Sequence, residues 1–404
     1  MSILDAAWHA LGEDPAVLAL VSPHGDQVPL DSALPVGQLV HDAVAASSLS
    51  AGLLVARRSD AAVPAVSLDP VRVATAVTSE RHFRLRGEPM NAWAELSGFW
   101  PTADGWVRTH ANYPHHRARL IEALDLTDAA DTAALRATLL GRSAADVEEA
   151  VTAAGGIATV VRSEAQWREH PQSAAVDAEP LIRVVRAGEG AHAPRGRVEW
   201  DAPAAGIRVL DLTRVISGPV ASRTLALWGA DVLRVDPPEL PELEWQHLDT
   251  GAGKRSTILS VDDPRFGELL DAADVVITGY RPGALDRHGL GVEDLVARRP
   301  GLVVARLSAW DGTGPLAERR GFDSIVQAAT GIAWLESTDG ERPGALPAQA
   351  LDHSAGYLLA AGITSALRRR IDEGGSWLVE TSLARVAHEL LAQPRGDRHE
   401  HPTW

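Results

Sequence analysis

The chain has 404 residues, 45% of them hydrophobic and 23% charged, which is enough for two domains and excludes a fibrous or disordered protein. A formal net charge of −16 without a basic block argues against a nucleic-acid partner. Cysteine is absent, so disulfide bonds, thiolate nucleophiles and Cys-ligated zinc are excluded.

The N-terminal segment, MSILDAAWHALGEDPAVLAL, is acidic and lacks the basic region of a secretory signal. We find no apolar run near the roughly 18 residues that a membrane span requires. We therefore expect a soluble cytoplasmic protein without a membrane partner.

The first 200 residues are rich in Ala, His and Trp, and Gly and Pro interrupt short elements. Within them, the pattern over 134–163 predicts two helices, a glycine turn and a strand. The stretch 187–206 contains several Pro and Gly residues and is typical of a linker. We therefore expect two regions, 1–200 and 201–404.

From residue 207 onwards, short β-rich runs alternate with helical patterns. Strands are predicted at 207–212, 231–236, 256–261, 273–278 and 302–308. Helices are predicted at 219–230, 264–272, 292–299 and 323–334. This alternation predicts an α/β fold with a Rossmann-like, doubly wound parallel sheet.

The unit at 207–236 has the strand, turn, helix and strand order of a nicotinamide-binding fold, with Asp236 ending its second strand. Its turn, TRVISGPVAS, contains only Gly218 of the glycines that such a site requires. The pattern therefore argues against hydride transfer.

An internal repeat connects the two regions. LPVGQLVHDAVAASSLSAGLLVARR at 34–58 resembles LPAQALDHSAGYLLAAGITSALRR at 346–369. Each copy is followed by a strand-like run and then by SLDPVRVA or SLARVA. The shared order indicates a duplicated helix and strand.

The second copy has one carboxylate, Asp352, near the start of its apolar helix. This Asp is either an N-cap or a residue that does chemistry. When the two LP pairs are aligned, Val40 lies opposite Asp352, and Asp42 is displaced by two positions. We therefore expect the first copy to lack the reactive acid.

Lys254, in GAGKRS, is the only lysine among 38 basic residues. A compact ammonium suits a phosphate better than a planar guanidinium does. Lys254 is therefore a candidate phosphate contact, with compositional drift as the alternative.

Five ordered motifs over roughly 206–392 resemble the catalytic half of the class III CoA-transferases, which include formyl-CoA, carnitine and succinyl-type transferases. The motifs are VLDLTRVISGPVASRTLALWGADVLRVDPPE, GKRSTILSV, ADVVITGYRPGALDRHGLG, GPLAERRGFDSIVQAATG and ALDHSAG. The segments at 104–126, 134–153 and 155–171 resemble the family's smaller domain and C-terminal return, which here come first. The resemblance implies the class III fold with a smaller α+β domain, either permuted or partly duplicated.

The resemblance implies that Asp352 is a nucleophile, which attacks an acyl-CoA thioester to give an aspartyl anhydride and then an aspartyl-CoA thioester. CoA then passes to a carboxylic acid acceptor, without a metal. Backbone donors near Gly344 or Gly356 are candidates for holding the oxyanion.

The resemblance also places CoA, as the acyl-CoA substrate, against turns and arginines of the second region. The implied residues are Val215, Ile216, Ser217, Leu259, Gly279, Tyr280, Arg281, Arg287, Arg319 and Arg320. Two departures from the family pattern concern substrate handling and affinity for the adenine end of CoA. Ile216 stands where some relatives have Gln, and Pro237 and Pro238 stand where many have a basic residue.

Two alternatives remain open. A 2-methylacyl-CoA racemase needs a His before the helix at 323–334, where this chain has Phe322, and His353 points about 100° away from Asp352 on its helix. The other alternative is a non-catalytic CoA-binding protein. The family resemblance further implies an interlocked homodimer.

Overall fold

A seven-stranded sheet lies between helices in the computed structural model, which describes residues 1–22, 27–194 and 196–395. The sheet has the strand order β6-β12-β11-β10-β7-β8-β9, and every neighbouring pair is parallel except β6 and β12. The strands are β6 (Arg183–Gly188), β7 (Arg208–Asp211), β8 (Asp231–Asp236), β9 (Arg255–Ile258), β10 (Val275–Thr278), β11 (Val303–Ser308) and β12 (Ser376–Ser382). The predicted doubly wound sheet is confirmed.

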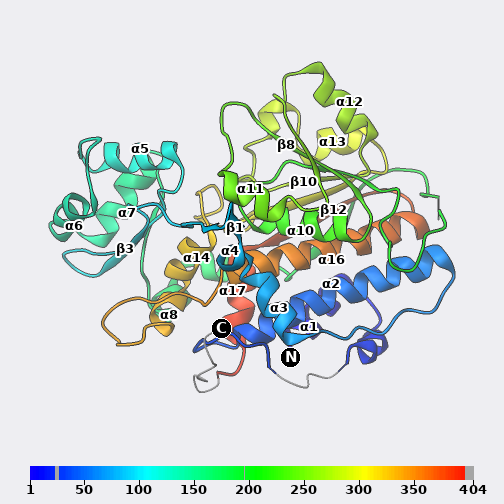
Figure 1. Cartoon of the computed structure of the whole chain (residues 1–404), viewed down its shortest axis with the longest axis horizontal. Coiled ribbons are helices and arrows are strands. Elements are labelled where there is room, and N and C mark those ends of the chain that lie inside the picture. The colour runs from blue at the N-terminus through cyan, green and yellow to red at the C-terminus, as the bar shows by residue number, and fades with distance from the viewer. Residues whose placement is uncertain (23–26, 195, 396–404) are drawn as a thin grey trace.

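Helices cover both faces of this sheet (Figure 1). Val275 of β10 packs in the cluster that contains α10 (Ser217–Leu227) and α16 (Ala350–Asp372), whereas its neighbour Val276 packs with α12 (Pro264–Ala272) and α13 (Val292–Arg298). Successive strand residues point to opposite faces. The near-continuous apolar strands are therefore explained by burial on both sides.

Local sequence sets several helix starts. Asp263 accepts a hydrogen bond from the N–H of Arg265, and Pro264 occupies the first turn of α12. The same Asp-Pro pair, Asp69 and Pro70, begins α3 (Pro70–Val77). An Asp N-cap followed by Pro is a favourable helix start because it satisfies a free N–H and presets φ.

The two repeat helices, α2 (Val36–Ser59) and α16, pack against each other along their length and run in the same direction (Figure 1). Ser50 Oγ donates a 2.8 Å hydrogen bond to Ala361 O and lies 2.7 Å from Thr364 Oγ1. About two helical turns further on, Arg57 pairs with Asp372. The duplicated segments are therefore packing partners.

By length and composition alone, α2 could cross a membrane, contrary to the expectation that no run of this kind exists. In its most apolar window 78% of the residues are buried inside the protein. Packing against α16 and α1 (Ile3–Leu11) accounts for this apolar character.

A smaller unit lies to one side of the large sheet (Figure 1). It has an antiparallel sheet of β3 (Gly98–Pro101), β4 (Trp106–Thr109) and β5 (Ala158–Val160), covered by α5 (Pro114–Ala123), α6 (Thr132–Leu140) and α7 (Ala144–Ala153). Its own core runs from Leu96 to Ala158. The predicted order of two helices, a glycine turn and a strand is confirmed by α6, α7, Gly155 with φ +76° and β5.

Elements of both expected regions, 1–200 and 201–404, share one core and one sheet. Trp8, Leu39 and Ile182 belong to the same core cluster as Leu359 of α16, and β6 joins the large sheet. The small unit has a core cluster of its own, from Leu96 to Ala158. The core around α2 therefore crosses residue 200, because α2 packs against α16 of the second region as well as against α1 of the first.

The remaining elements are short. They are η1 (Pro15–Leu20), α4 (Ser79–His82), β1 (Arg84–Leu85), β2 (Glu88–Pro89), α8 (Glu164–Glu169), α9 (Pro171–Asp177), α11 (Glu244–Thr250), η2 (Asp286–His288), α14 (Asp323–Thr330), α15 (Ile332–Leu335) and α17 (Leu383–Ala392).

Candidate active site

The strand order reverses at β7. From β7 the sheet extends through β8 to β9 on one side, and through β10, β11 and β12 on the other. In open parallel sheets, ligands bind at the carboxyl ends of the strands at such a reversal. Six predicted CoA contacts follow β7 and β10 and so meet at this edge: Val215, Ile216, Ser217, Gly279, Tyr280 and Arg281.

The turn after β7 has a strained backbone. Val215 has φ +71°, a conformation that is unfavourable for a β-branched residue. Its N–H donates a 2.9 Å hydrogen bond to Glu242 Oε2. At Gly218, a Cβ would lie 2.4 Å from the Thr213 side chain, so glycine is required there.

Asp352 is connected to this turn through helix packing. A Cβ on Gly356 of α16 would lie 2.5 Å from the carbonyl oxygen of Ser217, the first residue of α10. The backbones of α10 and α16 are therefore in close contact, one helical turn after Asp352. Ser217 Oγ is buried and has no hydrogen-bond partner in the described part of the chain.

Asp352 is not the N-cap of α16. Gln349 occupies that position and makes no side-chain capping bond. The Asp352 residue is 6% exposed, and its N–H donates a 2.9 Å hydrogen bond to Asp323 Oδ2. The capping interpretation is therefore wrong, and the carboxylate is available for another role.

The buried carboxyl groups of Asp352 and Asp323 influence each other's ionisation. Burial, the charge of Asp323 and the charge of Glu80 raise the pKa of Asp352 well above its ordinary value. Burial raises the pKa of Asp323 to about 6, although the Asp352 N–H and the Gln327 side chain donate to it. Because the charges repel, full ionisation of both groups is costly near neutral pH.

His353, the residue after Asp352, lies beside Glu80 of the first region. The His353 side chain is buried, and its Nε2 lies 3.8 Å from Glu80 Oε2 on α4. Adjacent helical residues point about 100° apart, so His353 and Asp352 leave α16 in different directions. Glu80 is a site neighbour that sequence reasoning missed.

The small unit contributes two histidines. The His110 ring stacks on Phe322, with 3.8 Å between ring centroids and 7° between planes, and His116 meets both rings edge-on. Burial and neighbouring His116 keep the pKa of His110 well below its ordinary value, and burial with His115 lowers that of His116 to about 3. Both rings are therefore neutral. The sequence THANYPHH holds these residues but gives no sign that they meet Phe322.

The predicted arginines lie around the site at differing depths. Arg281 is exposed and donates to Glu318 O at 3.0 Å, and exposed Arg287 contacts His288. Arg319 pairs with Glu148 of the small unit at 2.8 Å, and Arg320 donates to Gly155 O at 3.2 Å. The Arg319 and Arg320 side chains therefore join the two units.

Three residues do not have the surroundings that their predicted roles require. Leu259 follows β9, two strands from β7, and so lies outside the crevice between β7 and β10. Gly344 N–H already donates to Ala333 O at 2.8 Å, and Gly356 lies inside α16. These two glycines are therefore not free donors for an oxyanion, contrary to the prediction.

The structure corrects the prediction that Lys254 contacts a phosphate. Its side chain is 1% exposed, and its Nζ donates to Asp211 Oδ2 at 3.1 Å and to Pro219 O at 2.9 Å. An ammonium enclosed in this way has no open approach for a phosphate. Lys254 instead neutralises a buried carboxylate, which explains why a lysine is needed here.

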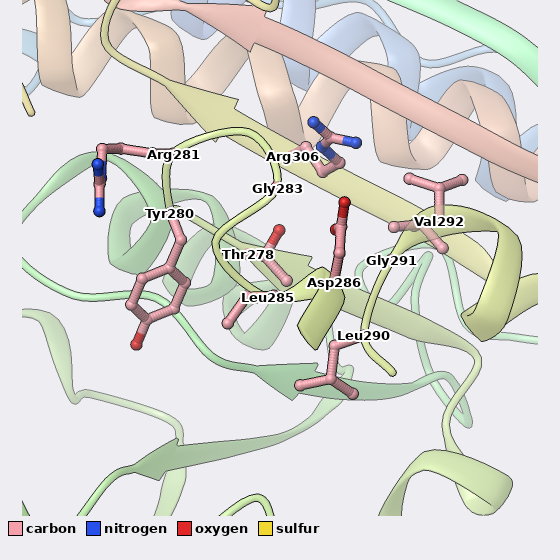
Figure 2. A pocket seen from close by; sticks show the side chains of 11 residues that line it. Thr278, Tyr280, Arg281, Gly283, Leu285, Asp286, Leu290, Gly291, Val292 and Arg306 are labelled. Atoms are coloured by element: carbon pink, nitrogen blue, oxygen red, sulfur yellow. The ribbon is translucent and has the colours of Figure 1, made fainter. Parts of the chain in front are cut away.

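A small cavity open to solvent lies beside the loop that follows β10. In Figure 2 this loop carries Tyr280, Arg281 and Asp286 around the cavity, with Arg306 of β11 nearby. Tyr280 and Arg281, two of the predicted CoA contacts, line the cavity, whereas Asp352 does not. Within the described residues, no group of three or more His, Cys, Asp or Glu could hold a metal ion.

Comparisons with known proteins find relatives of part of the chain. Residues 204–399 match the family model described as CoA-transferase family III. Over 207 residues the chain is 33% identical to "Probable fatty acyl-CoA transferase Rv3272" of Mycobacterium tuberculosis, a match that covers 47% of this chain and 52% of that protein. It is 29% identical to mouse "Succinyl-CoA:glutarate CoA-transferase" over 52% of each chain.

A crystal structure of Rv3272 from M. tuberculosis matches with 34% identity and a TM-score of 0.43, over 46% of this chain and 56% of that one. The chain thus spans about half the length of the relatives it matches. The likeness to CoA-transferase family III lies in residues 204–399, the segment that contains Asp352.

Proposed function

We propose that the chain is a CoA-transferase that moves CoA from an acyl-CoA to a carboxylic acid, with Asp352 as the nucleophile. One observation carries the proposal: Asp352, a buried carboxylate unused as a helix cap, lies one helical turn before the contact of α16 with Ser217, in the segment that matches family III. Because the match covers only about half of these relatives' length, the activity of the whole chain is itself part of the proposal.

In the first half of the reaction, a carboxylate oxygen of Asp352 attacks the thioester carbonyl. The C–S bond breaks, CoA leaves as a thiolate, and a mixed anhydride forms. The thiolate then attacks the Asp352 carbonyl carbon. The anhydride C–O bond breaks, the donor acid leaves as a carboxylate, and an aspartyl-CoA thioester remains.

In the second half, the acceptor carboxylate attacks the aspartyl thioester and releases the CoA thiolate, which gives a new anhydride. The thiolate attacks the acceptor's carbonyl carbon, and the Asp352 carboxylate leaves unchanged. No net proton transfer is required, so an aspartate can act as both nucleophile and leaving group.

The surroundings of Asp352 favour covalent steps. Its ionised form is disfavoured by burial and by the charges of Asp323 and Glu80. Anhydride formation removes the negative charge from Asp352. Repulsion that is present in the free enzyme is therefore relieved in the acylated enzyme, which promotes attack.

The decisive experiment is mass spectrometry after incubation with a panel of acyl-CoAs, with and without hydroxylamine, which intercepts anhydrides and thioesters. We expect an adduct at Asp352 and its loss in Asp352→Asn, which should still fold and bind CoA. Asp42→Asn is the matched control, because Asp42 lies near the start of the other repeat helix and accepts from Leu4 N–H. Absence of any adduct across the panel would favour a non-catalytic CoA-binding protein.

A second candidate is isomerisation at the carbon next to the thioester, as in 2-methylacyl-CoA racemases. The stacking of His110 on Phe322 favours it, because it brings a neutral imidazole beside the position that lacks a histidine. Deuterium uptake at that carbon in D₂O, lost in His110→Asn, would support it. Acyl-CoA recovered without deuterium would exclude it.

The family resemblance also leads us to propose an interlocked homodimer in the cytoplasm. Light scattering coupled to size exclusion tests the dimer. A monomeric particle that retains transfer activity would contradict it.

A further inference from the structure

Glu242 lies between β8 and α11 and joins three parts of the molecule. Its side chain is 3% exposed. Oε2 accepts from Val215 N–H at 2.9 Å and from Arg234 Nη2 at 3.1 Å, and Oε1 accepts from the Tyr113 hydroxyl at 2.5 Å. One carboxylate therefore contacts the strained turn after β7, the large sheet and the small unit.

The contact to Val215 bears on the conformation of the turn. A positive φ at a β-branched residue costs free energy and persists only where neighbouring contacts hold it. The Glu242 carboxylate accepts the N–H of the strained residue itself. Loss of this acceptor would leave the turn free to relax toward an ordinary φ.

Neighbouring charges keep Glu242 ionised. Burial opposes ionisation, but Arg214, the Tyr113 hydroxyl, the Val215 N–H and Arg234 together hold the pKa of Glu242 below its ordinary value. Hydrogen bonds to an ionised acceptor are about twice as strong as neutral ones. The carboxylate is thus a firm anchor for the turn.

Tyr113 brings the small unit into this arrangement. It is 3% exposed at the start of α5, and its ring lies under the Arg214 guanidinium, 4.8 Å from the ring centroid. Its hydroxyl also lies 3.1 Å from Gln246 Oε1 of α11. The small unit therefore inserts a buried side chain next to the turn.

We propose that Glu242 is a positioning residue for CoA binding, which holds the turn at Val215 in its strained conformation, and that Tyr113 couples this turn to docking of the small unit. The inference rests on the proposed function, because it assumes that the turn contacts CoA. It gives the first region of the chain a role in ligand affinity.

The test measures the Kd of CoA by calorimetry and the hydrogen exchange of residues 213–217. Glu242→Gln keeps the shape but removes the charge, and we expect the Kd to rise about tenfold, as loss of a charge-assisted hydrogen bond predicts. Exchange at the turn should become faster. Tyr113→Phe should act in the same direction with about a threefold rise.

Two further variants separate positioning from general destabilisation. Glu244→Gln, on the exposed start of α11, is the matched control and should leave both readouts unchanged. Glycine adopts positive φ without strain, so in a V215G background the E242Q change should raise the Kd by less than about threefold. An equal rise with and without V215G would overturn the inference.

The outcomes distinguish this inference from the proposed function. A wild-type protein that binds no CoA overturns both. Wild-type binding with an unchanged Kd and unchanged turn exchange in E242Q overturns the inference alone. If E242Q does not fold, Y113F and V215G/Y113F provide the same comparison, because the Tyr113 hydroxyl contacts the same carboxylate.

Discussion

The backbone N–H of Asp352 donates a 2.9 Å hydrogen bond to the carboxylate of Asp323, so that two acidic residues lie next to each other at the buried start of α16. Each ionised carboxylate disfavours the other. The proposed attack nevertheless requires Asp352 in its ionised form. The rate of the proposed reaction should therefore depend on pH through this pair.

We expect kcat/KM for acyl-CoA to rise with pH as Asp352 ionises, because its pKa is raised above the ordinary value by burial and by Asp323 and Glu80. Asp323→Asn removes the neighbouring charge and should move the acid limb of the pH profile to lower pH by about one unit. Glu95→Gln, at an exposed position of the small unit, is the control. An acid limb that stays in place in Asp323→Asn would show that the two carboxyls do not interact.

Stability should depend on pH through Asp323 as well. Burial raises its pKa to about 6 in the folded chain, from 3.8, so the folded state binds more protons than the unfolded state between these values. The free energy of unfolding should therefore fall as pH rises from about 4 through about 6, by up to about 3 kcal/mol. Urea denaturation across this range measures the slope, which should flatten in Asp323→Asn. A slope shared by both proteins would contradict this assignment.

Gly356→Ala should disturb the contact between α10 and α16. The added Cβ would lie 2.5 Å from Ser217 O and 2.9 Å from Val220 Cβ, so one helix has to move. We expect a loss of about 1–3 kcal/mol in the free energy of unfolding and a lower kcat. Gly267→Ala in α12 is the control, since its Cβ meets the guanidinium end of one long side chain, Arg298, rather than the backbone of another helix. Full activity in Gly356→Ala would mean that this contact does not position Asp352.

Lys254→Met should destabilise the fold without weakening CoA binding. It leaves Asp211, which is fully buried, without its 3.1 Å ammonium partner, and breaking such a pair costs about 3–5 kcal/mol. The double variant D211N/K254M removes both charges and should regain more than half of this loss. Denaturation and calorimetry together check the prediction. A weaker affinity for CoA at unchanged stability would restore the phosphate-binding interpretation of Lys254.

The local pattern of the sequence predicted the large sheet well. The strand at 231–236 and the helix at 264–272 have the observed limits, because alternating apolar runs and an Asp-Pro start determine them. The turn after β7 and the loop after β10 were predicted to share one site by the family resemblance alone, and the structure adds that they follow neighbouring strands of the sheet.

The remaining features depend on contacts between distant parts of the chain. Nothing near Lys254 in sequence reveals that Asp211 lies against it, and nothing in THANYPHH reveals that Tyr113 reaches Glu242. The linker-like stretch at 187–206 suggested a domain boundary, although the preceding strand β6 pairs with β12. Tertiary packing therefore decided both the domain limits and the role of the lysine.

Because α2 and α16 pack side by side in the same direction, each repeat copy limits the size of the residues that the other can carry at their contact. Ser50 corresponds to Gly362 when the LP pairs are aligned, and it touches Ala361 and Thr364, close to its own counterpart. A larger residue at Ser50 would press directly on the helix that carries Asp352. The first copy has no acid at the position that matches Asp352, yet its helix shape limits where the helix that carries Asp352 can lie.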